Sequence, residues 1–510
     1  MALSPVDYVV FISFLVLVVG VSLYASRHEK NAEDYFLAGR GLSWWLIGIS
    51  LIASNISTEQ FVGMAGAGFG SMGLAVASYE WVAAITLVFV ALVLLPRFLR
   101  AGIYTIPEYL EYRYSRGART VMSVYMLAMY AFVALASILY SGALGIQAIF
   151  GFDLAWSVWA LGALAAGYTI YGGLKAVVWS DLIQGVALLL GGLLCLGLGL
   201  QATGGWSSFA STHADKLHMM LPADHPEIPW TAMIFGIWVP NLFYWGLNQF
   251  ITQRTLGARS LAHGQHGILF AALIKLAIPF IIVIPGIMAV SLYGSEIASP
   301  DQAYPVLITH LLPAGLRGFM LAALFGAVMS SLDSLLNSAS TIYTMDLHAQ
   351  YVRPGLSQRE LVRVGRVATA VLVIAGCAMA PALADPRLGG IFRYIQMFQG
   401  FVSPGIVTVF LFGIVVSRAP ASAAVGALLL NPVVYGVLLL TLPQVAFLNH
   451  MAITVTVLAI FMAAMTAARP SSTTIRLPAS GPVDLQPSRY APYAGTAIVL
   501  LTVVLYVIFW

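Results

Sequence analysis

The sequence predicts an all-α protein that crosses a membrane many times. Of its 510 residues, 60% are hydrophobic and only 9% are charged, whereas about a quarter of the residues in a soluble domain are charged. Apolar runs of roughly 20 residues, the length of a helix that crosses a bilayer, recur from end to end. The net charge of +4 is small, and the basic residues stand beside the apolar runs, so membrane topology accounts for them better than nucleic-acid binding does.

We count fourteen apolar spans. The first is expected to be a transmembrane helix rather than a cleaved signal peptide, because Asp7 and no basic residue stands at its start. The spans cover approximately residues 6–25, 42–69, 74–99, 119–148, 155–173, 176–201, 231–253, 263–293, 317–345, 362–383, 390–416, 420–442, 447–467 and 490–509.

The positive-inside rule gives these spans an orientation. With the first residue outside and the spans alternating, 19 of the 24 lysine and arginine residues fall in inside loops, Arg119 and Arg254 among them. Cytoplasmic loops carry such an excess, and a miscounted span would reverse the pattern from that point on. We therefore expect fourteen helices in the plasma (inner) membrane, with the N-terminus outside.

The sequence predicts neither a metal site nor a disulfide framework. The longest polar stretch, 202–230, holds His213, His218 and His225, whose irregular spacing favours a solvated loop. Both cysteines fall within apolar spans.

Six polar residues between Ser54 and Gln60 interrupt the second span. A membrane helix satisfies its own backbone, so polar side chains at this depth are costly and usually functional. Serine, threonine and asparagine compete for backbone hydrogen bonds and thereby favour a break in the helix. A broken helix offers free carbonyls to a cation and free N–H groups to a polar solute. The alternative is a polar seam that joins two helices.

Charged residues also occur within other spans. Lys275 lies among apolar residues in the eighth span, where a charge costs about 2.5–3.5 kcal/mol, so it should face a wet cavity and a partner. We pair it with Glu80, which follows Tyr79 near the start of the third span. By itself Glu80 fits binding of a cation, a proton or solute hydroxyls, and it equally fits an idle position among lipid headgroups. Asp181 either faces inner water or lines an ion exit path.

The seventh span presents amides and aromatic rings on one helix face. Asn241, Tyr244, Trp245 and Asn248 are spaced at i, i+3, i+4 and i+7. This face suits stacking on a sugar ring and hydrogen bonding to its hydroxyl groups. The alternative is an aromatic belt at the membrane interface.

Two later spans also carry polar residues. Phe392 and Gln396 share a face at the start of the eleventh span; they suit a stacking gate and a reader of hydroxyl groups, or else an ordinary polar helix entry. Ser330, Ser331 and Ser334 in the ninth span supply neutral oxygens that suit an alkali cation. Serines at this spacing also mediate helix packing.

Together these residues resemble the sodium/solute symporter family, in particular its sodium-coupled glucose/galactose branch. The matching motifs occur in the expected order over nearly the whole chain. They are Gly39-Arg40-Gly41-Leu42-Ser43, Ala53 to Gly63, Tyr171 to Asp181, Asn241 to Leu256, Ser330 to Asp346, and Tyr394 to Pro404.

The resemblance implies a five-plus-five inverted-repeat transporter core with a broken helix at Ser54–Ser57. The implied regions are 1–41, the first transmembrane helix and inner loop; 42–201, the first repeat; 202–230, an outer loop; 231–419, the second repeat; and 420–510, three peripheral transmembrane helices.

The resemblance also implies site residues by motif match. Sugar hydroxyls would be bound by Asn55, Gln60, Glu80, Asn241, Lys275 and Gln396. The gates would be Met64, Tyr79 and Phe392 on the outer side and Tyr244, with Trp245 nearby, on the inner side. Sodium would be bound by carbonyls of Ala53, Ile56 and Ala327 and hydroxyls of Ser330 and Ser331, with Asp181 on its exit path. Asp333 departs from the sugar transporters, which often have a small neutral or hydroxyl residue there; with Ser334 and Asp181 it would make a second cation site.

The function expected from this resemblance is secondary active symport. Inward sodium flow would drive uptake of a neutral hexose of the galactose or glucose type by alternating access. An inositol, a sialic acid or an amino acid is the alternative solute, although the run of amides and one buried carboxylate fits polyols better. The expected partners are sodium, the solute and the lipid bilayer. An enzyme is not expected, because the spans show no nucleophile–base or metal constellation.

Overall fold

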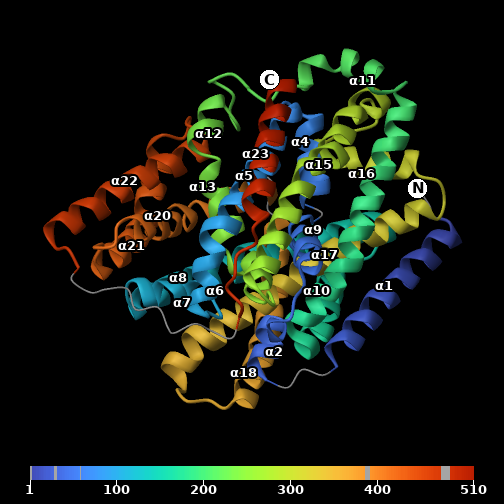
Figure 1. Ribbon diagram of the computed structural model, residues 1–510. Helices are drawn as coiled ribbons and strands as arrows, with labels where there is room; N and C mark the ends of the chain where they lie inside the picture. The colour runs from blue at the N-terminus through green and yellow to red at the C-terminus, as the bar shows by residue number, and fades with distance from the viewer. Residues whose placement is uncertain (1–2, 28–30, 58, 385–390, 472–482) are drawn as a thin grey trace.

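The computed structural model describes residues 3–27, 31–57, 59–384, 391–471 and 483–510. These residues form helices and connecting loops (Figure 1), and their β-pairing is confined to isolated bridges such as Leu42 with Ala258. The α-helices are α1 (Pro5–Ser26), α2 (Ala32–Leu37), α3 (Trp44–Asn55), α4 (Ala65–Phe69), α5 (Ser78–Phe89), α6 (Leu95–Ala101), α7 (Ile106–Arg113), α8 (Arg116–Ala128), α9 (Leu135–Phe150), α10 (Leu154–Ala202), α11 (Trp206–Thr212), α12 (Trp230–Phe235), α13 (Trp238–Leu242), α14 (Gln249–Leu256), α15 (Leu261–Tyr293), α16 (Ala303–Leu311), α17 (Leu316–Ile342), α18 (Gln358–Met379), α19 (Ile391–Gln399), α20 (Ser403–Val415), α21 (Ala421–Thr441), α22 (Phe447–Ala468) and α23 (Ala491–Ile508).

Short 3-10 and π segments connect or extend these helices. The 3-10 segments are η1 (Ala38–Arg40), η3 (Gly73–Ala77), η6 (Ala214–Lys216), η8 (Pro300–Gln302) and η10 (Ala380–Ala384), and the π segments are η2 (Glu59–Met64), η4 (Val90–Leu94), η5 (Met129–Ala134), η7 (Phe243–Leu247) and η9 (Tyr343–Val352).

The prediction of a polytopic helical membrane protein is confirmed. Within the described ranges, 10 helical stretches are long and apolar enough to cross a membrane. The count of fourteen stays a prediction, because other expected spans are short or broken helices, such as Trp44–Asn55 and Ser403–Val415. The orientation of the N-terminus and the inverted-repeat boundaries also stay predictions.

The second expected span is broken, as its polar residues predicted. α3 ends at Asn55, the backbone of Ile56 is extended, and the chain resumes helically in η2. The N–H of Ser57 donates to the side chain of Gln60 at 3.0 Å. In a continuous helix this N–H would donate to the carbonyl of Ala53, so the break withdraws the donor from that carbonyl.

The broken helix lies against the long helices α10, α15 and α17 (Figure 1). Small residues allow this close approach. A Cβ at Gly267 on α15 would lie 2.8 Å from Ile47 Cβ, and a Cβ at Gly185 on α10 would lie 2.9 Å from Ala53 Cβ. The backbone of α3 is therefore fixed next to both neighbours. α20, α21 and α22 lie together to one side of this core (Figure 1).

The expected spans 155–173 and 176–201 both lie in α10, and a kink at Gly173 separates them. Gly173 has φ 50° and ψ −151°, a backbone conformation that glycine adopts readily. A side chain there would also meet the backbone of Tyr35. The second half of α10, which carries Asp181, thereby starts in a new direction.

A buried ion pair joins α8 to the end of the α17–η9 helix. Arg119 Nη2 lies 2.5 Å from Asp346 Oδ1. Thr105 donates to the same carboxylate at 2.7 Å and Ser123 at 3.0 Å. Arg119 is buried, contrary to its expected position in a loop. The ion pair therefore attaches α8 to the continuation of α17, the helix that carries Ser330 and Ser331.

Arg119→Leu should lower the thermal unfolding temperature of the purified protein in detergent. The change leaves Asp346 buried without its cation, and removing one partner of a buried pair costs about 3–5 kcal/mol. Arg116→Leu is the matched control, since Arg116 is 58% exposed and lies 3.4 Å from Glu111. Equal unfolding temperatures for the two variants would contradict a stabilising role for the buried pair.

Candidate functional site

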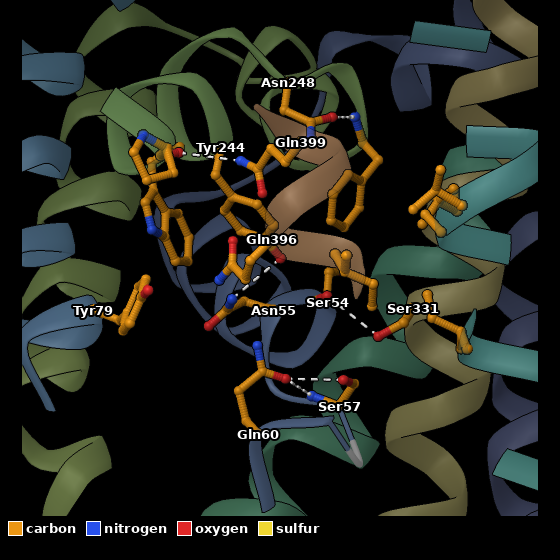
Figure 2. A pocket seen from close by; sticks show the side chains of 18 of the residues that line it. Ser54, Asn55, Ser57, Gln60, Tyr79, Tyr244, Asn248, Ser331, Gln396 and Gln399 are labelled. Atoms are coloured by element: carbon orange, nitrogen blue, oxygen red, sulfur yellow. Dashed lines mark hydrogen bonds between the residues drawn. The ribbon is translucent and has the colours of Figure 1, made fainter. Parts of the chain in front are cut away.

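A cavity of about 140 Å³ lies beside the broken helix. Because a water molecule takes up about 30 Å³ in the liquid, a cavity of this size has room for several waters or one small solute. Its walls come from α3, η2, α5, η5, the α13–η7–α14 segment, α17 and α19. The polar lining residues are Ser54, Asn55, Ser57, Gln60, Tyr79, Glu80, Tyr130, Asn241, Tyr244, Asn248, Ser331, Gln396 and Gln399. Figure 2 labels all of these except Glu80, Tyr130 and Asn241.

Lys275 and Glu80 form a buried ion pair, as the sequence predicted. The ammonium group donates to Glu80 Oε2 and to Asn55 Oδ1. It also lies 4.7 Å from the ring centroid of Trp245, which is a favourable cation–π position. Lys275 is fully buried behind the lining, whereas Glu80 reaches the cavity. The pair therefore brings no net charge to the cavity wall.

Asn55 connects three helical segments at the break. Its oxygen accepts from Lys275, and its Nδ2 donates to the Tyr244 hydroxyl at 3.1 Å (Figure 2). Gln60 folds back on Ser57 and accepts from both its N–H and its hydroxyl, at 3.0 and 2.9 Å. Two of the predicted solute ligands are thus attached to the break itself.

The seventh expected span is also broken, yet its predicted face still lines the cavity. Asn241, Tyr244, Trp245 and Asn248 all lie on the wall. The backbone of Asn248 is extended, so these residues come from α13, η7 and the loop after it rather than from one continuous helix. Asn241 Nδ2 donates to the carbonyl of Ile237 at 3.0 Å. The side-chain oxygen of Asn241 can therefore accept a hydrogen bond from another donor.

Gln396 and Gln399 approach the cavity from α19. Gln396 Oε1 is buried, and no hydrogen-bond partner for it is found among the described residues. Gln399 Nε2 lies 3.5 Å from the Pro240 carbonyl. Met64 and Tyr79 also line the cavity. The side chain of Phe392, the third predicted outer-gate residue, lies outside the described part of the structure.

One predicted sodium ligand, Ser331 on α17, contacts the backbone of α3 at the break; the complete sodium site stays a prediction. Ser331 Oγ lies 3.3 Å from the carbonyl oxygen of Ser54, next to the Ala53 carbonyl that the break exposes. Ala53, Ile56 and Ala327 are buried. Carbonyl and hydroxyl oxygens of this kind suit a hard cation. Ser330 instead donates to Asp181 Oδ1 at 2.5 Å.

The side chains of Ser50, Ser54, Ser330 and Arg254 surround Asp181 and form the Asp181 cluster. The sequence did not predict that Arg254 belongs to it. Arg254 Nη1 lies 3.1 Å from Asp181 Oδ2, and it also donates to the Ser50 and Ser54 hydroxyls. Arg254 was expected in an inside loop but is 1% exposed on α14. The one signal that could have suggested it is the need of buried Asp181 for a cation.

The proposed second cation ligands diverge. Ser334 Oγ lies 2.8 Å from Ser54 Oγ, within the Asp181 cluster. Asp333 is turned toward α10, where Thr169 Oγ1 donates to it at 2.8 Å. A second site that uses Asp333, Ser334 and Asp181 together therefore stays a prediction.

Comparison with known proteins identifies the family. Residues 35–431 match the Sodium:solute symporter family. A sodium/glucose cotransporter of Vibrio parahaemolyticus is 43% identical over 454 residues, 83% of this chain and 83% of that protein. Sodium/myo-inositol cotransporter 2 of Oryctolagus cuniculus is 35% identical over 468 residues, 84% of this chain and 69% of that protein. This chain belongs to the sodium:solute symporter family.

As a sodium:solute symporter, the chain is an integral membrane protein that transports sodium together with a solute, and sodium is its coupling ion. Members of this family are transporters rather than enzymes. Sodium/glucose cotransporter 1 of Ovis aries is also similar, at 34% identity over 84% of this chain and 70% of that protein.

Solved structures show that the fold is that of a sodium-coupled transporter. A Na⁺-coupled sialic acid symporter in a substrate-bound, outward-open state has a TM-score of 0.82 at 23% identity, covering 92% of this chain and 100% of that one. Mhp1, a nucleobase-cation-symport-1 family transporter, has a TM-score of 0.57 at 13% identity, covering 92% and 99%.

We expect Lys275→Met and Glu80→Gln each to lower the unfolding temperature, while the double variant recovers part of the loss. Each single change strands one member of a buried pair, at a cost of roughly 3–5 kcal/mol. The double change removes both charges. Thermal unfolding of the four proteins in detergent measures this coupling. Additive losses would show that the two side chains act independently.

Proposed function

We propose that this symporter couples inward sodium flow to uptake of a neutral hexose of the galactose or glucose type. One observation carries the proposal: the break in α3 contributes to both candidate sites. Asn55 and Gln60 face the cavity, while the Ser54 carbonyl meets Ser331 at 3.3 Å on the predicted sodium side. An ion that orders the break would therefore also order the solute ligands.

The transport cycle we propose is alternating access, in which the shared segment couples the binding of sodium and solute. Sodium held by Ala53, Ile56, Ala327, Ser330 and Ser331 fixes the break and raises the affinity for the solute. By linkage, the solute raises the affinity for sodium by the same factor.

Gates at either end of the cavity complete the cycle. Met64, Tyr79 and Phe392 close it from the outer side. Tyr244, which accepts from Asn55, then moves with Trp245 to open the inner side, and sodium leaves past Asp181.

The charge balance of the cavity favours a neutral polyol. Lys275 is occupied by Glu80 and Asn55, so a solute carboxylate would have to compete with Glu80 for it. Amides such as Asn241, Gln396 and Gln399 both donate and accept, which suits hydroxyl groups. Sialic acids and amino acids carry a carboxylate and fit this lining less well. An inositol is the closest alternative, because a sodium/myo-inositol cotransporter is 35% identical.

One sodium ion supplies enough free energy for accumulation. Moving one charge across 100 mV gains about 2.3 kcal/mol, and a tenfold sodium gradient adds about 1.4 kcal/mol. Together these support a roughly several-hundredfold solute gradient. We propose a single sodium, because Arg254 already balances the charge of Asp181. The alternative is a second ion at Asp333 and Ser334.

Labelled galactose and glucose uptake into proteoliposomes tests the proposal. The wild type should accumulate hexose only when an inward sodium gradient is imposed. Gln396→Ala should lose uptake by removing a hydroxyl ligand, and Ser331→Ala by removing a sodium ligand. Thr454→Val on α22, a buried hydroxyl that donates within its own helix at 2.8 Å, is the control and should retain uptake.

Hexose accumulation without an inward sodium gradient, whether driven by protons or by no gradient, would overturn the sodium coupling. If no hexose moves, the hexose assignment is wrong, and labelled myo-inositol and sialic acid in the same vesicles identify the alternative.

A further inference from the structure

The break between α19 and α20 faces the peripheral helix α21. α19 ends at Gln399, and the next three residues form tight i→i+3 hydrogen bonds, including Val402 N to the Gln399 carbonyl at 3.1 Å. Pro404 then opens α20. Since proline has no N–H, the Gly400 carbonyl has no donor four residues ahead. α19 carries Gln396 and Gln399 into the cavity, so the geometry of this break sets where those amides lie.

Asn431 on α21 binds the break directly. Its Nδ2 donates to the carbonyl of Phe401. Gly405 gives it room, because a Cβ there would lie 2.8 Å from Asn431 Cβ. Pro432 follows within α21 and withdraws the helical donor from the Leu428 carbonyl. Tyr125 of α8 approaches that carbonyl at 3.3 Å. α21 is thus itself attached to α8.

Tyr435, one turn after Asn431, closes over the break. A side chain at Gly400 would overlap the Tyr435 ring, and the ring packs edge-on against Phe401 with centroids 5.1 Å apart. Two residues on one face of α21 therefore hold two successive residues of the break.

Three polar atoms around this contact are buried without a hydrogen-bond partner among the described residues. They are Asn431 Oδ1, the Tyr435 hydroxyl and Ser403 Oγ. Buried polar groups are nearly always hydrogen-bonded, and each unpaired one costs about 1–3 kcal/mol. A contact that served packing alone would be more stable with apolar side chains here. The Asn431 and Tyr435 atoms on α21 and the Ser403 hydroxyl at the start of α20 instead leave polar groups on both sides that could bond after a shift of the α19–α20 break.

We propose that Asn431 and Tyr435 are positioning residues that latch the α19–α20 break and so hold Gln396 toward the solute. α21 is thereby part of the transport machinery rather than a scaffold. The proposal rests on the proposed function for its kinetic consequences, since it assigns Gln396 to the solute. Its structural consequence, the restraint of α19, does not depend on which solute is transported.

The kinetic test is Asn431→Leu, which keeps the side-chain size and removes the donor to Phe401. The KM for the solute should rise about threefold to fifteenfold, the range expected for one interhelical hydrogen bond in a membrane protein, while the maximal sodium-driven rate changes less than about twofold. Tyr435→Phe keeps the ring and should raise the KM less than Asn431→Leu does. Thr454→Val should behave as wild type. A wild-type KM in Asn431→Leu would overturn the proposal.

The structural test follows α19 without any solute. A thiol is introduced at position 396 by Gln396→Cys in a protein whose two cysteines are replaced by alanine, and its alkylation by a maleimide is timed. Adding Asn431→Leu should change this rate about threefold to fifteenfold, whereas Thr454→Val should not. Should Asn431→Leu fail to fold, Gly400→Ala strains the same latch from the other side. An unchanged alkylation rate would overturn the latch even if hexose transport is confirmed.

Discussion

A helix that breaks inside a membrane must satisfy the backbone groups it frees, and the rest of this structure depends on how α3 does so. No bulk solvent is available there. The side-chain oxygen of Gln60 accepts hydrogen bonds from the N–H and the hydroxyl of Ser57, and the Ser331 hydroxyl donates to the Ser54 carbonyl. The carbonyl of Ala53, which loses its helical donor, is the group we propose for the cation, and the side chains of Asn55 and Gln60, which line the cavity, are those we propose for the solute.

Charge compensation is the second constraint. Lys275 with Glu80, Arg254 with Asp181 and Arg119 with Asp346 are three buried pairs in the described part of the chain, and each joins helices distant in sequence. Buried charges are tolerated when paired and hydrogen-bonded. Two of the pairs stand beside the candidate sites, which therefore present polar but balanced surfaces. A neutral solute and a single added cation are consistent with that balance.

Much of this arrangement was predictable, because polar residues inside apolar runs are conspicuous. The break near Ser54 and the pairing of Lys275 with Glu80 followed from the cost of polar groups in a membrane. The burial of Arg254 was not predicted, because Arg254 stands at the edge of an apolar run and its burial depends on Asp181, 73 residues away. The role of Asn431 was also not predicted, because its partner, the Phe401 carbonyl, is distant in sequence and lies at a break in another helix. The role of Asp333 as a cation ligand stays a prediction.

One broken helix is proposed to link the ion and the solute, and this link can be measured by equilibrium binding. The dissociation constant for labelled galactose, measured on purified protein in detergent in sodium and then in potassium, isolates the link from transport. We expect galactose to bind roughly 5- to 150-fold tighter in sodium, the usual range of coupling between two sites, and we expect Ser331→Ala to lose this difference. Equal binding in both salts by the wild type would contradict the proposed link.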